Sequence, residues 1–382
     1  MSEPRNIVVV THYYPSHGGG VELVAFELAR RLSATSGLRV VWFASDTDVA
    51  PQSPALDCEP VPAWNFLERR LGVPWPIWSP FRLRAMWRAI GASRGVHIHD
   101  TLYMGNVLAA LMARIRRKPL VVTQHIGLVP YKSRVLRGIM AAANRLVALP
   151  VLRRATKVVF ISHAVRAYFE AMGRMGTTHL VPNGVDTDLY RPPTSRERAA
   201  ARASFGLRQG DIALVFVGRF VEKKGLALME RLARQMSNVQ WLLAGDGPID
   251  PDEWKLPNVR CFRGRRRETL RELLWAGNLL VLPSTGEGFP LVVQEAMATG
   301  LACIVSEETL EGYPAARGLV LSEPLGEGAF ERWLVRLQAI SERSVALPEP
   351  DVLADFAKKH WCWNRASAFY EKQFTSLADT GR

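Results

Sequence analysis

Cysteine is scarce in this 382-residue chain, and uninterrupted apolar runs are short. The four cysteines, Cys58, Cys261, Cys303 and Cys362, lie far apart and form no C-x-x-C pair. This spacing argues against a disulfide framework or a zinc site and fits a reducing compartment. The run NIVVV near the amino terminus is too short for a signal peptide or a membrane span, and no other stretch is both long and uncharged. We therefore expect a protein that is soluble or peripheral to a membrane.

Several catalytic signatures are also missing. The sequence contains neither G-x-S-x-G nor H-E-x-x-H, which argues against the common hydrolase and zinc-protease sites. The glycines after the first predicted strand do not form G-x-G-x-x-G, so a nicotinamide site is weakly supported. We expect no metal site and no resident cofactor.

Acidic residues are rare in one long segment. Residues 52–157 contain 17 lysines and arginines but only four acidic residues, which accounts for the whole net charge of +13. One interpretation is a solvated helical surface. The other is attraction to phosphates, on an anionic lipid, a nucleic acid or a phosphorylated substrate.

Aromatic and basic residues alternate inside this segment, over residues 62–88. Aromatic rings beside cations are typical of a membrane interface. We expect this patch to bind an anionic bilayer through Trp75, Trp78, Arg82, Arg84, Trp87 and Arg88. The alternative is a core tryptophan cluster with a solvated basic rim.

Short β-rich runs and helical patterns alternate along the chain. The pattern begins with NIVVV and GVELVAFELARRL, and it restarts after a turn-rich segment near Pro182 with IALVFVG and GLALMERLARQ. Such alternation predicts an α/β fold of parallel sheets covered by helices. We expect two doubly wound, Rossmann-like domains, over residues 1–185 and 186–363, facing across a cleft. We expect a last helix, residues 364–382, to pack back on the first domain.

Candidate binding residues follow the predicted strands. Gly18, Gly19 and Gly20 stand between the first strand and the first helix, where a backbone can approach an anion. Arg219 and Lys224 follow the first strand of the second domain and suit a diphosphate. His125 ends a first-domain strand. A tight turn, solvated cations and a structural histidine are the simpler alternatives.

Two glutamates flank an apolar stretch in GEGFPLVVQEAMATG. Glu287 and Glu295 are eight residues apart. They suit an acid/base pair for glycoside cleavage, two clamps on a hydroxyl-rich ligand, or solvated positions at a helix start. Eight residues rotate a helix by roughly 80° from a whole number of turns, so the two side chains would not share one helical face. If Glu287 precedes the helix and Glu295 lies within it, clamps are the better interpretation.

Together these motifs resemble the retaining family 4 glycosyltransferases. The matching segments are Gly18–Gly20 with Glu22, PNGVD at Pro182–Asp186, VGRFVEKKG, AGDGP and PSTGEGFPLVVQEAMATG, the last being the Glu-x7-Glu signature. The resemblance spans nearly the whole chain and implies a GT-B fold. It also implies transfer of a hexose-type sugar from a nucleoside-diphosphate sugar, with retention of anomeric configuration and no metal.

The resemblance also implies roles for individual residues. Arg219 and Lys224 would hold the donor diphosphate, Glu287 the sugar hydroxyls and Glu295 the ribose. Gly18, Gly19 and Gly20 would approach the diphosphate from the other domain, and His125 matches a histidine near the reaction centre. The backbone of Gly264 and Arg265 would meet the nucleobase. The loop and helix start would approach sugar and phosphate through Gly288, Phe289, Pro290 and Leu291.

For the acceptor, the basic patch suggests a membrane-associated substrate. We expect a polyprenyl-diphosphate-linked glycan in bacterial surface-polysaccharide assembly, at the inner face of the cell membrane. The alternatives are a soluble or different lipid acceptor, or a nucleotide-sugar epimerase or sensor with the same fold. Nucleic-acid binding is a further rival that the charge permits, but no recognition motif accompanies it, and we do not expect it.

Overall fold

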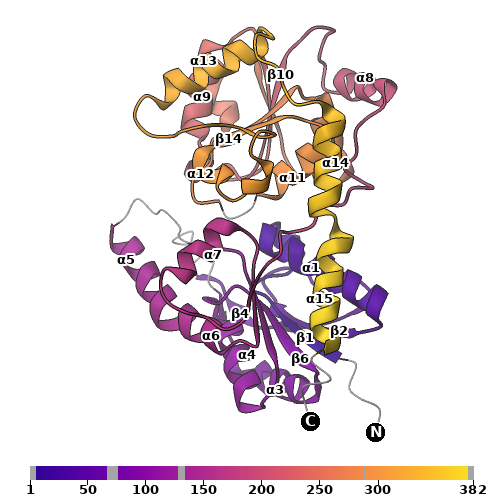
Figure 1. Cartoon of the computed structure of the whole chain (residues 1–382), viewed down its shortest axis with the longest axis vertical. Helices are drawn as coiled ribbons and strands as arrows, with labels where there is room; N and C mark the ends of the chain where they lie inside the picture. Colours follow the sequence, from indigo (N-terminus) through magenta and orange to yellow (C-terminus); the bar gives the residue numbers. More distant parts are fainter. Residues whose placement is uncertain (1–5, 67–75, 128–133, 288–289, 377–382) are drawn as a thin grey trace. The chain divides into compact units, whose positions relative to one another are not determined.

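The computed structural model describes residues 6–66, 76–127, 134–287 and 290–376 and divides into two compact units. Unit 1 contains Met1–Gly184 and Trp363–Arg382, and unit 2 contains Val185–Cys362 (Figure 1). The sequence-based boundaries were 185/186 and 363/364. Each unit is built on one parallel sheet, as the alternation of strands and helices predicted.

Unit 1 has a seven-stranded parallel sheet in the order β3-β2-β1-β6-β7-β8-β9. The strands are β1 (Asn6–Val10), β2 (Arg39–Ser45), β3 (Leu56–Val61), β6 (Gly95–His99), β7 (Leu120–Gln124), β8 (Lys157–Phe160) and β9 (Thr178–Leu180). Every residue of β6 and β7 is buried, because helices cover both faces of the sheet. Chain order reverses between β1 and β6, so the carboxyl ends of these two neighbours form the switch point where doubly wound sheets bind ligands.

Helices and short elements surround this sheet. They are η1 (Pro15–His17), α1 (Gly20–Ser36), the hairpin strands β4 (Ala63–Trp64) and β5 (Ile77–Trp78), η2 (Pro80–Arg82), α3 (Leu83–Ala92), α4 (Met104–Ile115), α5 (Arg134–Ala143), η3 (Asn144–Ala148), α6 (Leu149–Arg154), α7 (His163–Glu170) and α15 (Trp363–Ser376). The last of these belongs to unit 1 although it follows unit 2 along the chain (Figure 1). Its Tyr370 hydroxyl lies 2.8 Å from the hydroxyl of Thr123, which fixes the helix to the end of β7.

Unit 2 has a six-stranded parallel sheet in the order β12-β11-β10-β13-β14-β15. Its elements are α8 (Ser195–Ser204), β10 (Ala213–Val217), η4 (Glu222–Lys224), α9 (Leu226–Gln235), β11 (Gln240–Ala244), η5 (Pro251–Trp254), β12 (Val259–Phe262), α10 (Glu268–Ala276), β13 (Leu279–Leu282), α11 (Leu291–Ala298), β14 (Cys303–Ser306), α12 (Glu307–Leu310), η6 (Pro314–Ala316), β15 (Leu321–Glu323), α13 (Ala329–Ser341) and α14 (Pro350–Trp361). Here the order reverses between β10 and β13, which pair through Leu214 with Leu279 and Val215 with Leu280.

Two residues of unit 2, Asn278 and Cys303, have structural roles. The side-chain oxygen of Asn278 accepts a hydrogen bond from the backbone N–H of Ala213 and so joins the starts of β13 and β10. Cys303 is fully buried in β14. Asn278 and Cys303 therefore serve the sheet and its core.

The expected membrane patch is wrong at Trp78. This side chain is 2% exposed and belongs to the hydrophobic core of unit 1. Its ring lies against Gly105 of α4, where a Cβ atom would collide with it. A ring held in this way cannot enter a bilayer. The core alternative holds at this position because the β4–β5 hairpin folds Trp78 inward.

The other residues of the expected membrane patch differ in their exposure. Trp75 lies outside the described residues. Trp87 is half-buried with the Arg116 guanidinium over its ring, 5.2 Å from the centroid. Arg82 is exposed and pairs with Glu59 at 3.3 Å. Arg84 and Arg88 are exposed on α3. Arg82, Arg84 and Arg88 thus lie at the surface, whereas Trp78 is buried and Trp87 is half-buried.

The expectation about apolar length is also corrected. Residues Arg134–Arg154 form one helical stretch of 21 residues that is long and apolar enough to cross a membrane, by length and composition only. The charges at Arg137 and Arg145 interrupt this run in the sequence. A search for uninterrupted apolar runs therefore misses this stretch, although its composition over the whole helical length is apolar.

Removing the Trp78 ring should test its place in the core. We expect Trp78→Ala to lower the free energy of unfolding by about 3–5 kcal/mol, because a buried aromatic ring leaves a cavity. Phe81, which is 89% exposed, provides the matched control. Phe81→Ala should change stability by less than about 0.5 kcal/mol in the same denaturant titration. Equal effects of the two substitutions would contradict the burial of Trp78.

Candidate active site

The predicted donor-binding residues of unit 2 meet at its switch point. Arg219 and Lys224 follow the end of β10, and Glu287 follows the end of β13. Since β10 and β13 are parallel neighbours, both loops leave the same edge of the sheet. The Lys224 Nζ lies 2.8 Å from Glu287 Oε1, and the two side chains are only 13% and 11% exposed. Arg219 is exposed on the same loop as Lys224.

Backbone contacts hold these two loops together. The N–H of Thr285 donates to the carbonyl of Lys223 at 2.8 Å. Gly225 has a φ of 76° and lies against Pro283, so that any Cβ atom at this position would collide with the Pro283 carbonyl. The N–H of Gly286 donates to Glu308 Oε1 at 2.8 Å. The ion pair therefore sits on a backbone that is itself fixed.

The helix after the second loop separates the two glutamates as expected. Helix α11 begins at Leu291, so Glu287 lies in the preceding loop and Glu295 lies within the helix. Pro290 is the buried residue before the helix, and its carbonyl accepts a 2.7 Å hydrogen bond from the Tyr313 hydroxyl. Gly288 and Phe289 lie outside the described residues. Sequence reasoning missed Tyr313, because a tyrosine after an irregular segment carries no recognisable signal.

Glu295 is held by a second residue that the sequence did not reveal. The hydroxyl of Tyr190, a buried residue of the segment before α8, donates a hydrogen bond to the Glu295 carboxylate. Burial raises the pKa of Glu295 to about 7, and the hydrogen bond from Tyr190 opposes this shift. Burial, then the charge of Glu295, raises the pKa of Tyr190. Tyr190 is therefore a partner that stabilises the ionised form of Glu295.

The predicted nucleobase contact lies at the end of β12. Gly264 is exposed with a φ of 65°, and no atom stands within 4 Å of where its Cβ would be. Its N–H donates to Asp246 Oδ2 at 3.3 Å. The guanidinium of Arg265 lies 5.5 Å from the ring centroids of Phe205 and Phe262. The backbone here is open to a ligand on its exposed side.

In unit 1, the three predicted glycines lie at the other switch point. Gly18 has a φ of 81° and ends η1, Gly19 is the residue before α1, and Gly20 is its first residue. Glu22 of the first turn folds back against Gly19, where a Cβ atom would meet its carboxylate. The glycines thus let the backbone turn tightly at the amino end of a 17-residue helix.

His125 belongs to a buried polar cluster at the ends of β6 and β7. Its Nε2 lies 3.0 Å from Nδ1 of His99, and its backbone N–H donates to Asp100 Oδ1 at 2.8 Å. Burial lowers the pKa of His125 to about 3, so the imidazole is neutral near neutral pH. Burial also raises the pKa of Asp100 to about 7. In the described part of the chain, Oδ2 of Asp100 and Nε2 of His99 are buried without a hydrogen-bond partner.

Three Asp-x-Asp pairs occur in the chain. The expectation of no metal site did not take this spacing into account. Asp48 pairs with His17, and Asp250 and Asp252 pair with Arg263. Asp186 accepts the N–H of Leu189. Among the described residues, no group of three or more histidine, cysteine or acidic side chains is arranged to hold a metal ion.

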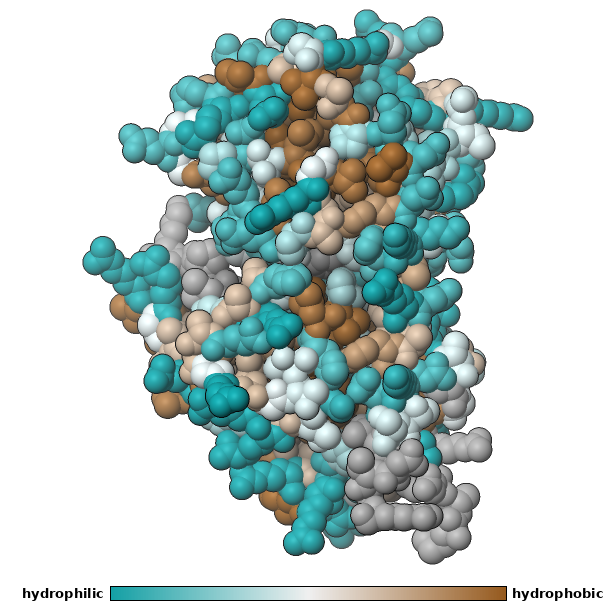
Figure 2. Space-filling model, in the orientation of Figure 1, coloured by the Kyte–Doolittle hydropathy of each residue, from teal (hydrophilic) through white to brown (hydrophobic). Residues whose placement is uncertain are grey.

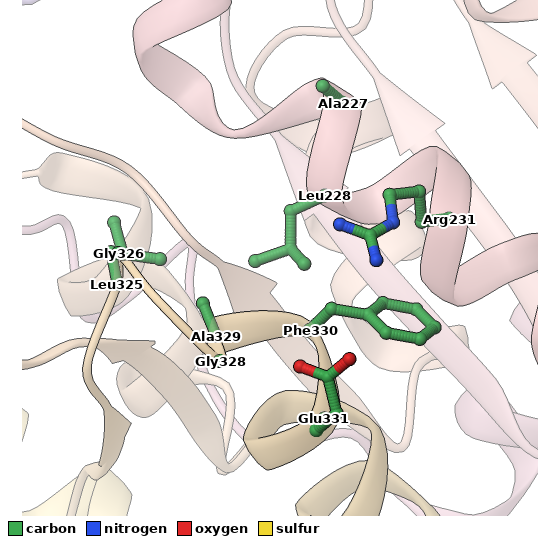
Figure 3. Close-up of a pocket in the computed structure, with 9 residues that line it drawn as sticks. All are labelled: Ala227, Leu228, Arg231, Leu325, Gly326, Gly328, Ala329, Phe330 and Glu331. Carbon is green, nitrogen blue, oxygen red and sulfur yellow. The ribbon is translucent and has the colours of Figure 1, made fainter.

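A cavity of about 310 Å³ lies elsewhere in unit 2, between α9 and the start of α13 (Figure 3). Leu228 points towards this space, and the Arg231 guanidinium lies 4.2 Å from the ring centroid of Phe330. None of the predicted donor-binding residues lines it. The chemistry that the sequence indicated is therefore at the switch point, not in this cavity.

The fold and the site define a class: two Rossmann-like units that present glycines, cations and carboxylates at their switch points. Comparison with known proteins agrees. The model of glycosyltransferase family 4 matches residues 18–189, and the model of glycosyl transferases group 1 matches residues 211–332. D-inositol 3-phosphate glycosyltransferase 1 of Catenulispora acidiphila is 30% identical over 331 residues, which cover 75% of this chain and 74% of that protein. The chain belongs to glycosyltransferase family 4 and is a glycosyltransferase.

Other relatives are matched over shorter parts of their length. Alpha-maltose-1-phosphate synthase of Mycobacterium tuberculosis is 31% identical over 246 residues, covering 58% of this chain and 62% of that protein. The chain thus spans less than two thirds of this relative, as it does of several others.

Solved structures share the fold along almost the whole chain. Sucrose-phosphate synthase from Thermosynechococcus elongatus superposes with a TM-score of 0.76 at 20% identity, covering 98% of this chain and 100% of that one. HepE of Anabaena, in complex with UDP and glucose, gives 0.75 at 17% identity and covers 97% and 99%. WaaG, a glycosyltransferase involved in lipopolysaccharide biosynthesis, gives 0.68 at 18% identity and covers 98% and 100%. The fold is GT-B.

The raised pKa of Glu295 makes a prediction about stability. Folding lifts this pKa from 4.5 to about 7, so the folded chain binds the proton more tightly than the unfolded chain. The contribution of Glu295 to stability is therefore full below pH 4.5 and is lost as the pH rises to about 7. The side chain of Glu295→Gln is neutral at every pH. Its melting temperature should therefore rise relative to that of the wild type as the pH increases across this window. Glu342→Gln, at an exposed position, controls for the loss of one carboxylate. The pKa shift of Glu295 would be contradicted if the difference in melting temperature between the wild type and Glu295→Gln stayed constant across this pH window.

Proposed function

We propose that this glycosyltransferase moves a hexose-type sugar from a nucleoside-diphosphate sugar to a membrane-associated acceptor, with retention of anomeric configuration. The observation that carries the proposal is the Lys224–Glu287 pair at the switch point of unit 2. It places a cation and a carboxylate that could bind sugar hydroxyls within hydrogen-bond distance of each other, with Arg219 on the same loop as Lys224. A sugar diphosphate needs both kinds of group. HepE, a structural relative, was solved with UDP-glucose, which supports a nucleotide sugar as the donor.

The chemistry follows from where charge develops. The bond between the anomeric carbon and the diphosphate oxygen breaks, and negative charge grows on the departing phosphate. Arg219 and Lys224 stabilise that charge without moving far, because their loops are held by the backbone contacts of Thr285 and Gly225. The acceptor hydroxyl oxygen forms the new bond on the face that the diphosphate leaves, and its proton passes to the departing phosphate. No resident cofactor or metal takes part in this proposal.

The two glutamates divide the donor between them. Glu287 lies beside Lys224 and faces the sugar hydroxyls next to the diphosphate. Glu295 lies inside α11 and receives the ribose hydroxyls, with Tyr190 holding its carboxylate. The two residues do not act as an acid/base pair. Gly18–Gly20 and His125 serve the same reaction from unit 1.

For the acceptor, we propose a polyprenyl-diphosphate-linked glycan in surface-polysaccharide assembly, at the inner face of the cell membrane. Two features support this. The positive charge of the chain is concentrated in residues 52–157, which suits a phosphate-bearing surface or substrate. Relatives in fold include WaaG and the lipopolysaccharide outer core galactosyltransferase WaaB. An epimerase with the same fold would instead release a free sugar, which product analysis with a labelled donor distinguishes.

Substitution of each glutamate should separate catalysis from nucleotide binding. We expect Glu287→Ala to lower the transfer rate by roughly 100-fold or more while the protein still binds free nucleoside diphosphate, because the sugar contact is lost. Glu295→Ala should weaken nucleoside-diphosphate binding by at least about tenfold, because the ribose hydroxyls lose a hydrogen-bond partner. Calorimetric titration and a transfer assay measure the two effects.

Control measurements keep this test interpretable. Glu287→Ala leaves Lys224 without its carboxylate, so melting curves must show that each variant is folded. If both variants lose binding and transfer to the same extent, the proposed division is wrong.

Donor identity and metal dependence can be tested with the wild-type protein. We expect one of the UDP, GDP or ADP sugars to raise the melting temperature more than the others, because binding to the folded state stabilises it. Transfer from that donor should persist in excess EDTA, since cationic side chains hold the diphosphate. Loss of transfer in EDTA with recovery on adding Mg²⁺ would refute the metal-independent mechanism. Analysis of the product anomer tests retention.

A further inference from the structure

One helix of unit 1 exposes an apolar face that none of the described residues covers. No residue of α5 (Arg134–Ala143) is buried, although the helix is strongly amphipathic. Val135, Ile139 and Leu146 are 72%, 57% and 73% exposed. Their spacing of four and seven residues places them along one side of the helical stretch. Apolar side chains aligned and exposed in this way mark a contact surface.

The charge of this helical stretch has one sign. Residues 134–154 contain five arginines, Arg134, Arg137, Arg145, Arg153 and Arg154, and no acidic residue. All five are exposed, and Arg134, Arg137 and Arg145 lie within the same segment, residues 134–148, as the aliphatic stripe. In Figure 2, the left edge of the view, where Figure 1 draws α5, shows brown and pale residues interspersed with teal ones. Aliphatic side chains flanked by arginines match a surface that is apolar within and negatively charged outside.

The other end of the same stretch is fixed in the protein. Ala148 and Leu152 belong to the core of unit 1, and the buried Asn144 donates a hydrogen bond to the Tyr168 hydroxyl at 3.1 Å. The π-helical turn Asn144–Ala148 lies between the exposed half and the buried half. Crossing a bilayer would withdraw these core residues from their contacts. The stretch is therefore suited to lie on a membrane, not to span it.

We propose that α5 and the following turn, Arg134–Ala148, dock unit 1 on an anionic phospholipid surface. Val135, Ile139 and Leu146 enter the boundary between head groups and acyl chains, while Arg134, Arg137 and Arg145 contact lipid phosphates. This surface takes the place of the tryptophan patch expected from the sequence, whose Trp78 is buried. The proposal deepens the proposed function, since a membrane-associated acceptor requires a docking surface. It is tested without donor or acceptor, and so independently of the transfer reaction.

Vesicle cosedimentation of the full-length protein measures docking directly. The probes are phosphatidylcholine vesicles with and without phosphatidylglycerol, at low and high salt. The wild type should bind the anionic vesicles and release them as salt rises. The triple variant Val135→Gln, Ile139→Gln, Leu146→Gln should lose at least about tenfold in vesicle affinity, because glutamine keeps the helix but removes the apolar stripe. The triple variant Arg134→Gln, Arg137→Gln, Arg145→Gln should lose mainly the dependence on anionic lipid.

Matched controls come from unit 2. Val335 of α13 and Val352 of α14 are 66% and 50% exposed on helices, so Val335→Gln with Val352→Gln controls for the apolar loss. Arg196, Arg208 and Arg343 are exposed and control for the loss of positive charge when changed to glutamine. Both control variants should bind vesicles as the wild type does, and all variants should keep the wild-type melting temperature.

Two results would overturn the docking surface. One is that the variant changed at Val135, Ile139 and Leu146 binds vesicles as tightly as the wild type, or that no form of the protein binds vesicles. The other is a wild type that self-associates in solution, together with a variant that is monomeric but binds vesicles as the wild type does. The stripe would then be a contact between two copies of the chain. If docking fails while the donor still raises the melting temperature, only the membrane surface is wrong.

Discussion

The reversal of chain order between β10 and β13 is the constraint on which the site of unit 2 depends. Two strands far apart in sequence lie side by side, and their loops leave the same edge. Only this arrangement brings Lys224 within 2.8 Å of Glu287. Glycines at the junction, above all Gly225 against Pro283, let the loops approach closely enough. Disturbing this junction would therefore separate a cation from a carboxylate that together suit a sugar diphosphate.

Unit 1 uses the same constraint with different chemistry. Its switch point carries glycines and the amino end of α1, and the neighbouring strand ends carry His99, Asp100 and His125. Burial keeps the histidines neutral and holds the pKa of Asp100 near 7, so this unit presents polar groups of little charge, whereas unit 2 presents fixed cations. Its positive charge lies on the surface instead, where Arg134, Arg137 and Arg145 share an exposed helical stretch with Val135, Ile139 and Leu146. The chain thus separates two uses of positive charge, one local to the site and one spread over an exposed helix.

The sequence predicted the architecture well because the signals were local. Buried strands appear in the sequence as short β-branched runs, and the helices after them show apolar periodicity, so β1, α1, β10 and α9 lie where they were expected. The position of Glu287 before α11 and Glu295 inside it was likewise confirmed, since Pro290 marks the helix start. The tryptophan patch failed at Trp78 because aromatic residues suit both a core and a membrane interface, and only the hairpin β4–β5 decides which. Tyr190, Tyr313 and Asp100 were missed because each acts on a residue distant in the chain.

What the sequence determined by itself was the α/β class, the two-domain order and the set of chemical groups at the strand ends, because each rests on neighbours along the chain. Tertiary structure alone decided which of those groups meet. It paired Lys224 with Glu287, placed Tyr190 on Glu295, buried Trp78 and left Val135, Ile139 and Leu146 uncovered. The physical reason is that burial and hydrogen bonding depend on contacts between segments that the sheet order brings together, and no local pattern records that order.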